Sequence, residues 1–193
     1  MALLFLQNTV EVPAALARNA EVWVVDQYAF RAQDMDGVSG VLFSQHLDEQ
    51  HLAEHQALWD GFLDRGGALA IQGPVHRPFV SAAGAFLPVK AGLRAEGWIL
   101  EMATPHAITA GVRPEDLSLR RGVIGFWGRG YLQPVVEATV LTRFRRSGAP
   151  VDWCYVSPSG GRLFVHPGND VWSFSSQGAR RLSSQLMAWM GGA

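Results

Sequence analysis

Residues 40–73 read GVLFSQHLDEQHLAEHQALWDGFLDRGGALAIQG, and they predict one strand–helix–strand unit. Gly40–Phe43 is a short apolar run, and Ala68–Ile71 is a second one. Between them Asp48 suits a helix N-cap, and apolar residues then recur at helical spacing until a double glycine ends the helix. Two strands joined by a helix in this way run parallel in one sheet.

The flanking sequence continues this alternation of strands and helices. The N-terminal part predicts a strand, a helix and a strand at Ala2–Leu6, Val12–Asn19 and Glu21–Val25. The last third predicts three strands and a helix at Ala138–Arg145, Val151–Val156, Arg162–Val165 and Ser175–Met190. Residues 75–134 are rich in Gly and Pro, with one clear strand at Trp98–Met102. We therefore expect a doubly wound α/β fold with a mostly parallel sheet, and a single domain over residues 1–193.

Composition narrows the classes of protein that fit. Hydrophobic residues make up 48% and charged residues 17%, which is typical of a globular chain with one core. The net charge is −1 and no terminus carries a block of like charges, so we expect no nucleic-acid partner. Cys154 is the single cysteine, which excludes an internal disulfide. The first apolar run is too short for a signal peptide or a membrane span, so we expect a cytoplasmic protein that does not enter a membrane.

Three stretches also resemble a known superfamily. Residues 62–73 (FLDRGGALAIQG), 104–112 (TPHAITAGV) and 149–170 (APVDWCYVSPSGGRLFVHPGND) are similar, in this order, to segments of the class I glutamine amidotransferase-like superfamily. They are most similar to its ThuA-like (trehalose-utilisation) branch. The resemblance implies a flavodoxin-like three-layer sandwich, with helices on both faces of the sheet.

The resemblance also shows which catalytic group is missing. A glutaminase of this superfamily needs a Cys at the turn after the fourth strand, with a His and a carboxylate beside it. Here Gln72 and Gly73 occupy that turn, and Cys154 lies in a strand-like run. His166 resembles the His of the family's "HPE" motif, with Asp170 as a substitute for the missing acid. We therefore predict no glutaminase activity.

Ligands of parallel sheets settle beyond the carboxyl ends of the strands. We expect a small polar ligand there, such as a carbohydrate derivative, and the candidate binding residues are Gln45, His46, Gln72, Gly73, His76, His106, His166, Asn169 and Asp170. His166, Asp170 and His76 are also the catalytic candidates, although His166 and His76 are equally well explained as histidines satisfied by the backbone. Trp127 and Trp172 stand in loop-like context, where an aromatic ring beside Arg129 or Asn169 would suit a flat ligand.

His46, His51 and His55 form the densest histidine cluster in the sequence. His51 and His55 have the i, i+4 spacing of metal ligands, but their amphipathic context favours a solvated helix flank. We expect neither a metal nor another cofactor.

Two further hypotheses belong to other functional classes. One is a sugar-modifying hydrolase or isomerase that uses His166 or His76 as general base, with Asp170 or Glu101 as partner. The other is a non-catalytic scaffold whose apolar surface drives homo-oligomerisation or docks another protein. Family likeness cannot choose among these functions.

Overall fold

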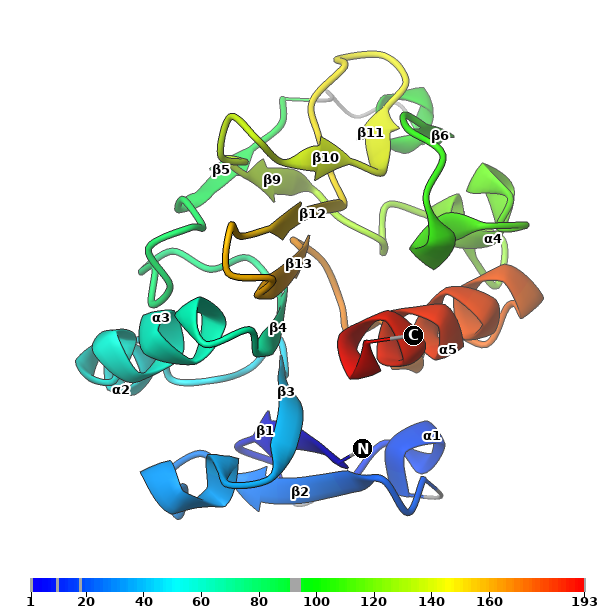
Figure 1. The fold of residues 1–193 in the computed structure, drawn as a ribbon. Helices are drawn as coiled ribbons and strands as arrows, with labels where there is room; N and C mark the ends of the chain where they lie inside the picture. Colours follow the sequence, from blue (N-terminus) through cyan, green and yellow to red (C-terminus); the bar gives the residue numbers. More distant parts are fainter. Residues whose placement is uncertain (1, 10, 18, 91–94, 193) are drawn as a thin grey trace.

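The computed structural model describes residues 2–9, 11–17, 19–90 and 95–192 (Figure 1). Within these residues a central sheet contains seven strands, in the order β10 (Thr139–Val140), β12 (Trp153–Val156), β13 (Arg162–His166), β4 (Ala68–Gln72), β3 (Val38–Phe43), β1 (Ala2–Gln7) and β2 (Val22–Asp26). The last five strands in this order are parallel, whereas β12 is antiparallel to both β13 and β10. The predicted mostly parallel sheet is confirmed.

The central strands are buried on both faces, which explains their continuous apolar runs. In β1, Phe5 packs into the core beneath helix α5 (Gln177–Gly191), and Leu6 packs into the opposite core beneath α3 (Gln56–Asp64). Figure 1 shows α2 and α3 on one side of the sheet and α5 on the other. This arrangement is compatible with a flavodoxin-like sandwich.

The helix predicted after Asp48 is divided in two at His55. Helix α2 (Glu49–Glu54) ends there, and α3 begins at the next residue. Nδ1 of His55 lies 3.0 Å from the backbone oxygen of His51, and Nε1 of Trp59 donates to the backbone oxygen of Leu52 at 3.0 Å. Side chains therefore occupy two carbonyl groups that a continuous helix would use for its own backbone bonds.

The predicted strand at Ala138–Arg145 is also divided. The N–H groups of Leu141 and Thr142 both bond to the backbone oxygen of Asp152, at 2.8 and 3.2 Å, which bends the strand as a bulge does. Only β10 then remains in the central sheet. The following strand β11 pairs elsewhere.

Short paired strands lie outside the central sheet. They are β5 (Phe86–Pro88) with β9 (Gly130–Leu132), β6 (Leu100–Met102) with β11 (Thr142–Phe144), and β7 (Leu119–Arg120) with β8 (Val123–Ile124). The N–H of Phe86 donates to the backbone oxygen of Val75 at 2.6 Å. The start of the Gly- and Pro-rich middle, just after β4, therefore lies beside β5.

The remaining helices are short. They are α1 (Ala14–Ala17), α4 (Pro114–Ser118), η1 (Ala32–Met35), η2 (Ala95–Trp98), η3 (Ala107–Thr109) and η4 (Val171–Ser173). The first of these is shorter than the predicted helix, of which Arg18 lies outside the described residues. Trp98 belongs to η2 and not to the strand predicted to begin there. Among the described residues, no helix is both long enough and apolar enough to span a membrane.

Candidate functional site

The carboxyl ends of β4 and β13 bring the turn at Gly73 next to His166. Gln72 and His166 are register partners, and the N–H of Gly73 donates to the backbone oxygen of His166 at 2.9 Å. Gly73 has a φ of +98°, and a Cβ there would lie 2.9 Å from Cα of Gln45. The expected juxtaposition is therefore present. The turn favours glycine because its φ is positive and because a side chain would meet the backbone of Gln45.

Gln72 connects neighbouring strand ends and does not face solvent. Its side chain is 2% exposed. Its Nε2 donates to the backbone oxygen of Phe43 at 3.3 Å, and its Oε1 accepts the N–H of Val171 at 2.8 Å. Both ends of the amide are therefore already used within the protein.

Asp170 has a similar structural role. Its Oδ1 accepts the N–H of Gln45 at 2.8 Å, and its Oδ2 accepts the hydroxyl of Ser44 at 3.0 Å. Burial raises the pKa of Asp170, although these hydrogen bonds and the nearby charges of His166 and His46 act in the opposite direction. The carboxyl group thus ties the loop after β13 to the end of β3.

His166 is completely buried and is paired with Asp152, not with Asp170 or Glu101. Its Nδ1 lies 2.6 Å from Oδ1 of Asp152, and both side chains are 0% exposed. Glu101 instead forms ion pairs with Arg143 and Arg145. In this conformation His166 cannot touch a ligand or abstract a proton from one.

Further hydrogen bonds hold both members of this pair. Nε2 of His166 lies 2.8 Å from the backbone oxygen of Asn169, which can only accept, so Nε2 donates. Oδ2 of Asp152 accepts hydrogen bonds from Nε1 of Trp127, at 2.8 Å, and from the hydroxyl of Thr142. Every polar side-chain atom of the pair is thus held by a partner inside the protein, and the buried pair fixes the start of the loop at residues 167–170.

A cleft of about 410 Å³ lies beyond these strand ends. Its wall includes the side chains of Pro74, His76, Phe86, Phe126, Arg129 and Asn169. Phe126 is 39% exposed, whereas Trp127, the aromatic residue expected at such a position, is 1% exposed. Trp172 is also buried and packs edge-on against Phe5.

Two contacts hold Arg129 at the cleft. Its Nε donates to the backbone oxygen of Gly125 at 3.3 Å, and its guanidinium lies 5.5 Å from the ring centroid of Trp98. Arg129 itself lies at the surface. Within the described part of the chain its two Nη groups make no hydrogen bond, so they are available to an anionic group.

Of the predicted ligand-binding residues, His76 and Asn169 line this cleft. The loop that carries Asn169 also contains Gly168, where a Cβ would lie 1.6 Å from the backbone oxygen of Trp127. An acidic residue therefore cannot replace Gly168 in this packing. Arg129 and Phe126 come from the middle of the chain, where their sequence context gives only a weak signal.

His106 lies elsewhere in the fold. Its Nε2 is 3.7 Å from Sγ of Cys154, and its ring lies 6.0 Å from that of Trp189 near the end of α5. Its Nδ1 accepts the N–H of Ile108 at 3.2 Å, so Nε2 carries the hydrogen and cannot deprotonate the thiol. The predicted placement of His106 at the rim of the ligand site is not what the structure has.

Cys154 is not an activated nucleophile. Its side chain is 2% exposed, and burial raises the pKa of its thiol to about 11. In the register of the sheet it lies opposite Phe164, two residues before His166, and it does not line the cleft. Cys154, the single cysteine of the sequence, therefore does not replace the missing thiol at Gly73.

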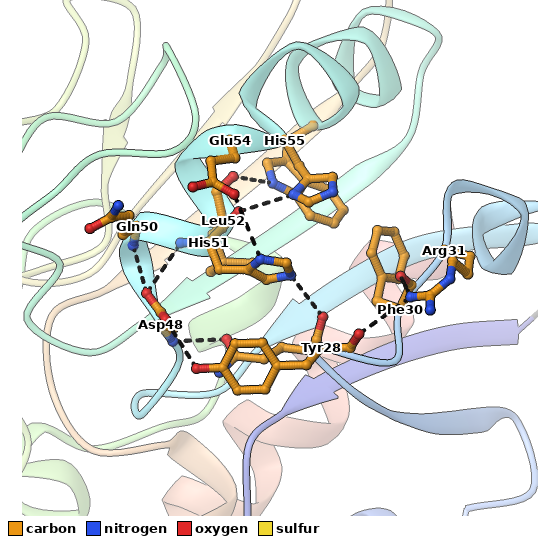
Figure 2. Close-up of polar contacts among 11 residues, drawn as sticks. Tyr28, Phe30, Arg31, Asp48, Gln50, His51, Leu52, Glu54 and His55 are labelled. Carbon is orange, nitrogen blue, oxygen red and sulfur yellow. Dashed lines mark hydrogen bonds and ion pairs between the residues drawn. The ribbon is translucent and has the colours of Figure 1, made fainter.

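His51 joins the segment after β2 to helix α2, and His55 ends that helix (Figure 2). Asp48 caps the helix by accepting the N–H groups of Gln50 and His51, and its Oδ2 accepts the hydroxyl of Tyr28 at 3.0 Å. Nε2 of His51 lies 3.1 Å from the backbone oxygen of Gln27. In the described ranges no three His, Cys, Asp or Glu side chains converge as metal ligands would.

Fold and site together define a mixed α/β protein with a mostly parallel sheet and a cleft at its carboxyl edge. No family model and no curated protein matches the chain. Among solved structures, the mmIFT52 N-terminal domain is similar, with a TM-score of 0.62 and 11% sequence identity. The match covers 100% of this chain and 98% of that one. At this identity the likeness concerns the fold alone.

Proposed function

We propose that this protein is an amidotransferase-like, ThuA-like protein without a nucleophile, and that it binds a small acidic carbohydrate derivative in the cleft beside Gly73. The proposal depends on one observation: the cleft combines a guanidinium that has free donors, an exposed aromatic ring and two further polar side chains. These belong to Arg129, Phe126, His76 and Asn169.

The chemistry of the wall supports this class of ligand. Arg129 can bind a carboxylate or phosphate with two parallel hydrogen bonds. The guanidinium of Arg120 lies over one face of Phe126, 5.6 Å from the ring centroid, and the other face can cover the apolar side of a sugar ring. The amide of Asn169 and the imidazole of His76 can bond to hydroxyl groups. A cleft of about 410 Å³ is within the usual range for small-molecule sites.

The amidotransferase-like assignment is supported by the turn after β4. It follows a buried parallel strand, has a glycine at positive φ and lies beside a histidine at the end of β13. The absence of a thiol near this turn supports binding without glutamine hydrolysis. His76 is the one catalytic candidate that lines the cleft, so an enzymatic rival would have to depend on it.

The test is calorimetric titration of the pure protein with glucuronate, glucose 6-phosphate and glucose. We expect the two anions to bind and glucose to bind at least about tenfold more weakly, because one ionic hydrogen-bonded contact contributes about 1.5–3 kcal/mol. Arg129→Gln should weaken the binding of both anions to the level of glucose. The matched control is Arg180→Gln, an exposed arginine on α5, which should leave binding unchanged.

Three results would contradict the proposal. These are no heat with any of the three compounds, equal weakening by both arginine variants, and ammonia release from glutamine by the wild-type protein. Turnover of a bound sugar acid that disappears in His76→Asn would instead support the enzymatic rival.

A further inference from the structure

Strand β2 forms one edge of the central sheet. It pairs with β1, and among the described residues no strand pairs with its other side (Figure 1). Trp23 on this strand is 47% exposed, and Tyr28 in the turn after the strand is 56% exposed. An open edge with exposed aromatic residues can pair with another strand, and natural proteins usually protect such edges.

The hydrogen bonds between β1 and β2 show which backbone groups of β2 point outward. The N–H of Leu3 donates to the oxygen of Glu21, and the N–H of Gln27 donates to the oxygen of Gln7. Odd-numbered residues of β2 therefore face β1, and the even-numbered ones face away.

Two of the outward groups are already used in turns. The N–H of Val22 donates to the oxygen of Asn19, and the oxygen of Asp26 accepts the N–H groups of Ala29 and Phe30. The outward groups that these turns leave are the oxygen of Val22, both groups of Val24 and the N–H of Asp26. This set is symmetric about Val24.

We propose that β2 pairs antiparallel with β2 of a second copy of the chain, about a two-fold axis at Val24. The two copies of Val24 exchange both of their hydrogen bonds, and each Asp26 N–H donates to the oxygen of Val22 in the other copy. Four hydrogen bonds then use every outward group that the turns leave. The hydrogen-bonding groups at the outer edge of β2 therefore match those of the same edge in a second copy.

The side chains suit the same register. Trp23 lies opposite Val25 of the second copy, an aromatic and β-branched pair of the kind that stabilises sheets. Asp26 lies opposite Val22, so no like charges face each other. The interface is small, and we expect a weak dimer. The cleft is separate, because β1 and β3 lie between β2 and β4.

Sedimentation of the full chain from about 1 μM to about 1 mM tests the dimer. The mean mass should rise from that of a monomer towards that of a dimer. Trp23→Lys should raise the dissociation constant at least about tenfold, because lysine is a usual protector of edges. Leu119→Lys is the control, since Leu119 is a comparably exposed residue on β7 and should not change the constant. Circular dichroism verifies that both variants are folded.

Oxidative cross-linking tests the register. In the proposed pair the Cα atoms of the two Val24 residues lie about 5.5 Å apart, so Val24→Cys should form a disulfide-linked dimer. The two copies of Asp26 lie about 13 Å apart along the strands, so Asp26→Cys should not. A monomer at every concentration overturns the proposal and leaves the edge to a strand of another protein. Equal cross-linking of the two cysteine variants, or no effect of Trp23→Lys, also overturns it.

Discussion

Nδ1 of His166 lies 2.6 Å from Oδ1 of Asp152, and neither side chain has any surface exposed to solvent. With Trp127 and Thr142 these residues form a polar network inside an otherwise apolar core. The pair binds the loop that carries Asn169 through a backbone carbonyl. It therefore acts on the cleft wall without reaching the cleft.

The network predicts a large effect of Asp152→Ala on stability. The change removes the buried partner of His166, Trp127 and Thr142, so the free energy of unfolding should fall by about 3–5 kcal/mol. Urea denaturation measures this fall. Asp64→Ala, at an exposed position on α3, should change it by no more than about 0.5 kcal/mol. Equal effects of the two substitutions would contradict the buried network.

The turn after β4 predicts that two glycines with similar φ tolerate alanine differently. Gly37 has a φ of +78°, and among the described residues no atom beyond its two chain neighbours lies within 4 Å of where its Cβ would be. Gly73 has a φ of +98° and the backbone of Gln45 within 2.9 Å. Gly37→Ala should lower the free energy of unfolding by about 1 kcal/mol through backbone strain alone. Gly73→Ala should cost about 1–3 kcal/mol more, because atoms must move apart. Thermal or urea unfolding measures the loss of stability in both variants. Equal losses would contradict the close contact between position 73 and Gln45.

Burial of Cys154 predicts a slow thiol. Its pKa is raised from 9.0 to about 11, so at pH 8 the folded protein holds about 100-fold less thiolate than the unfolded chain. Reaction with Ellman's reagent should be slower in the native protein by at least that factor. Denaturant should restore the normal rate. A native thiol that reacts as fast as the unfolded one would place Cys154 at the surface.

The raised pKa of Asp170 predicts a pH dependence of stability. Between the unfolded pKa of 3.8 and the higher folded pKa, the native state binds more protons than the unfolded state. The contribution of this group is therefore fully present below pH 3.8 and is lost as pH rises through the folded pKa. In Asp170→Asn the free energy of unfolding, measured from below pH 3.8 to above the folded pKa, should lack this pH-dependent contribution. If the free energy of unfolding changed with pH in the same way in both proteins, the raised pKa of Asp170 would be contradicted.

The central strands could be predicted because they are buried on both faces. β1 and β4 read as unbroken apolar runs, and their parallel order follows from the intervening helices. The break at His55 could not be predicted, because it depends on side chains that bond to carbonyl groups within the helix. The same holds for the bend at Leu141, which depends on a carbonyl from a later strand.

The candidate site was predictable to a similar extent. Topology brings Gly73 and His166 to one edge, since parallel strands end together. The pairing of His166 with Asp152 and the need for glycine at position 168 depend on contacts between distant segments, which no local pattern records. The family likeness of its segment predicts His106 beside the site, yet this residue packs against Cys154.

The position of β13 between β4 and β12 has a consequence for synthesis of the chain. Residues 68–72 remain without their second neighbour until residues 162–166 have left the ribosome. One edge of β4 therefore stays unpaired while residues 73–161 are synthesised. Nascent chains that stop before β13 should be the species most prone to aggregate or to recruit chaperones.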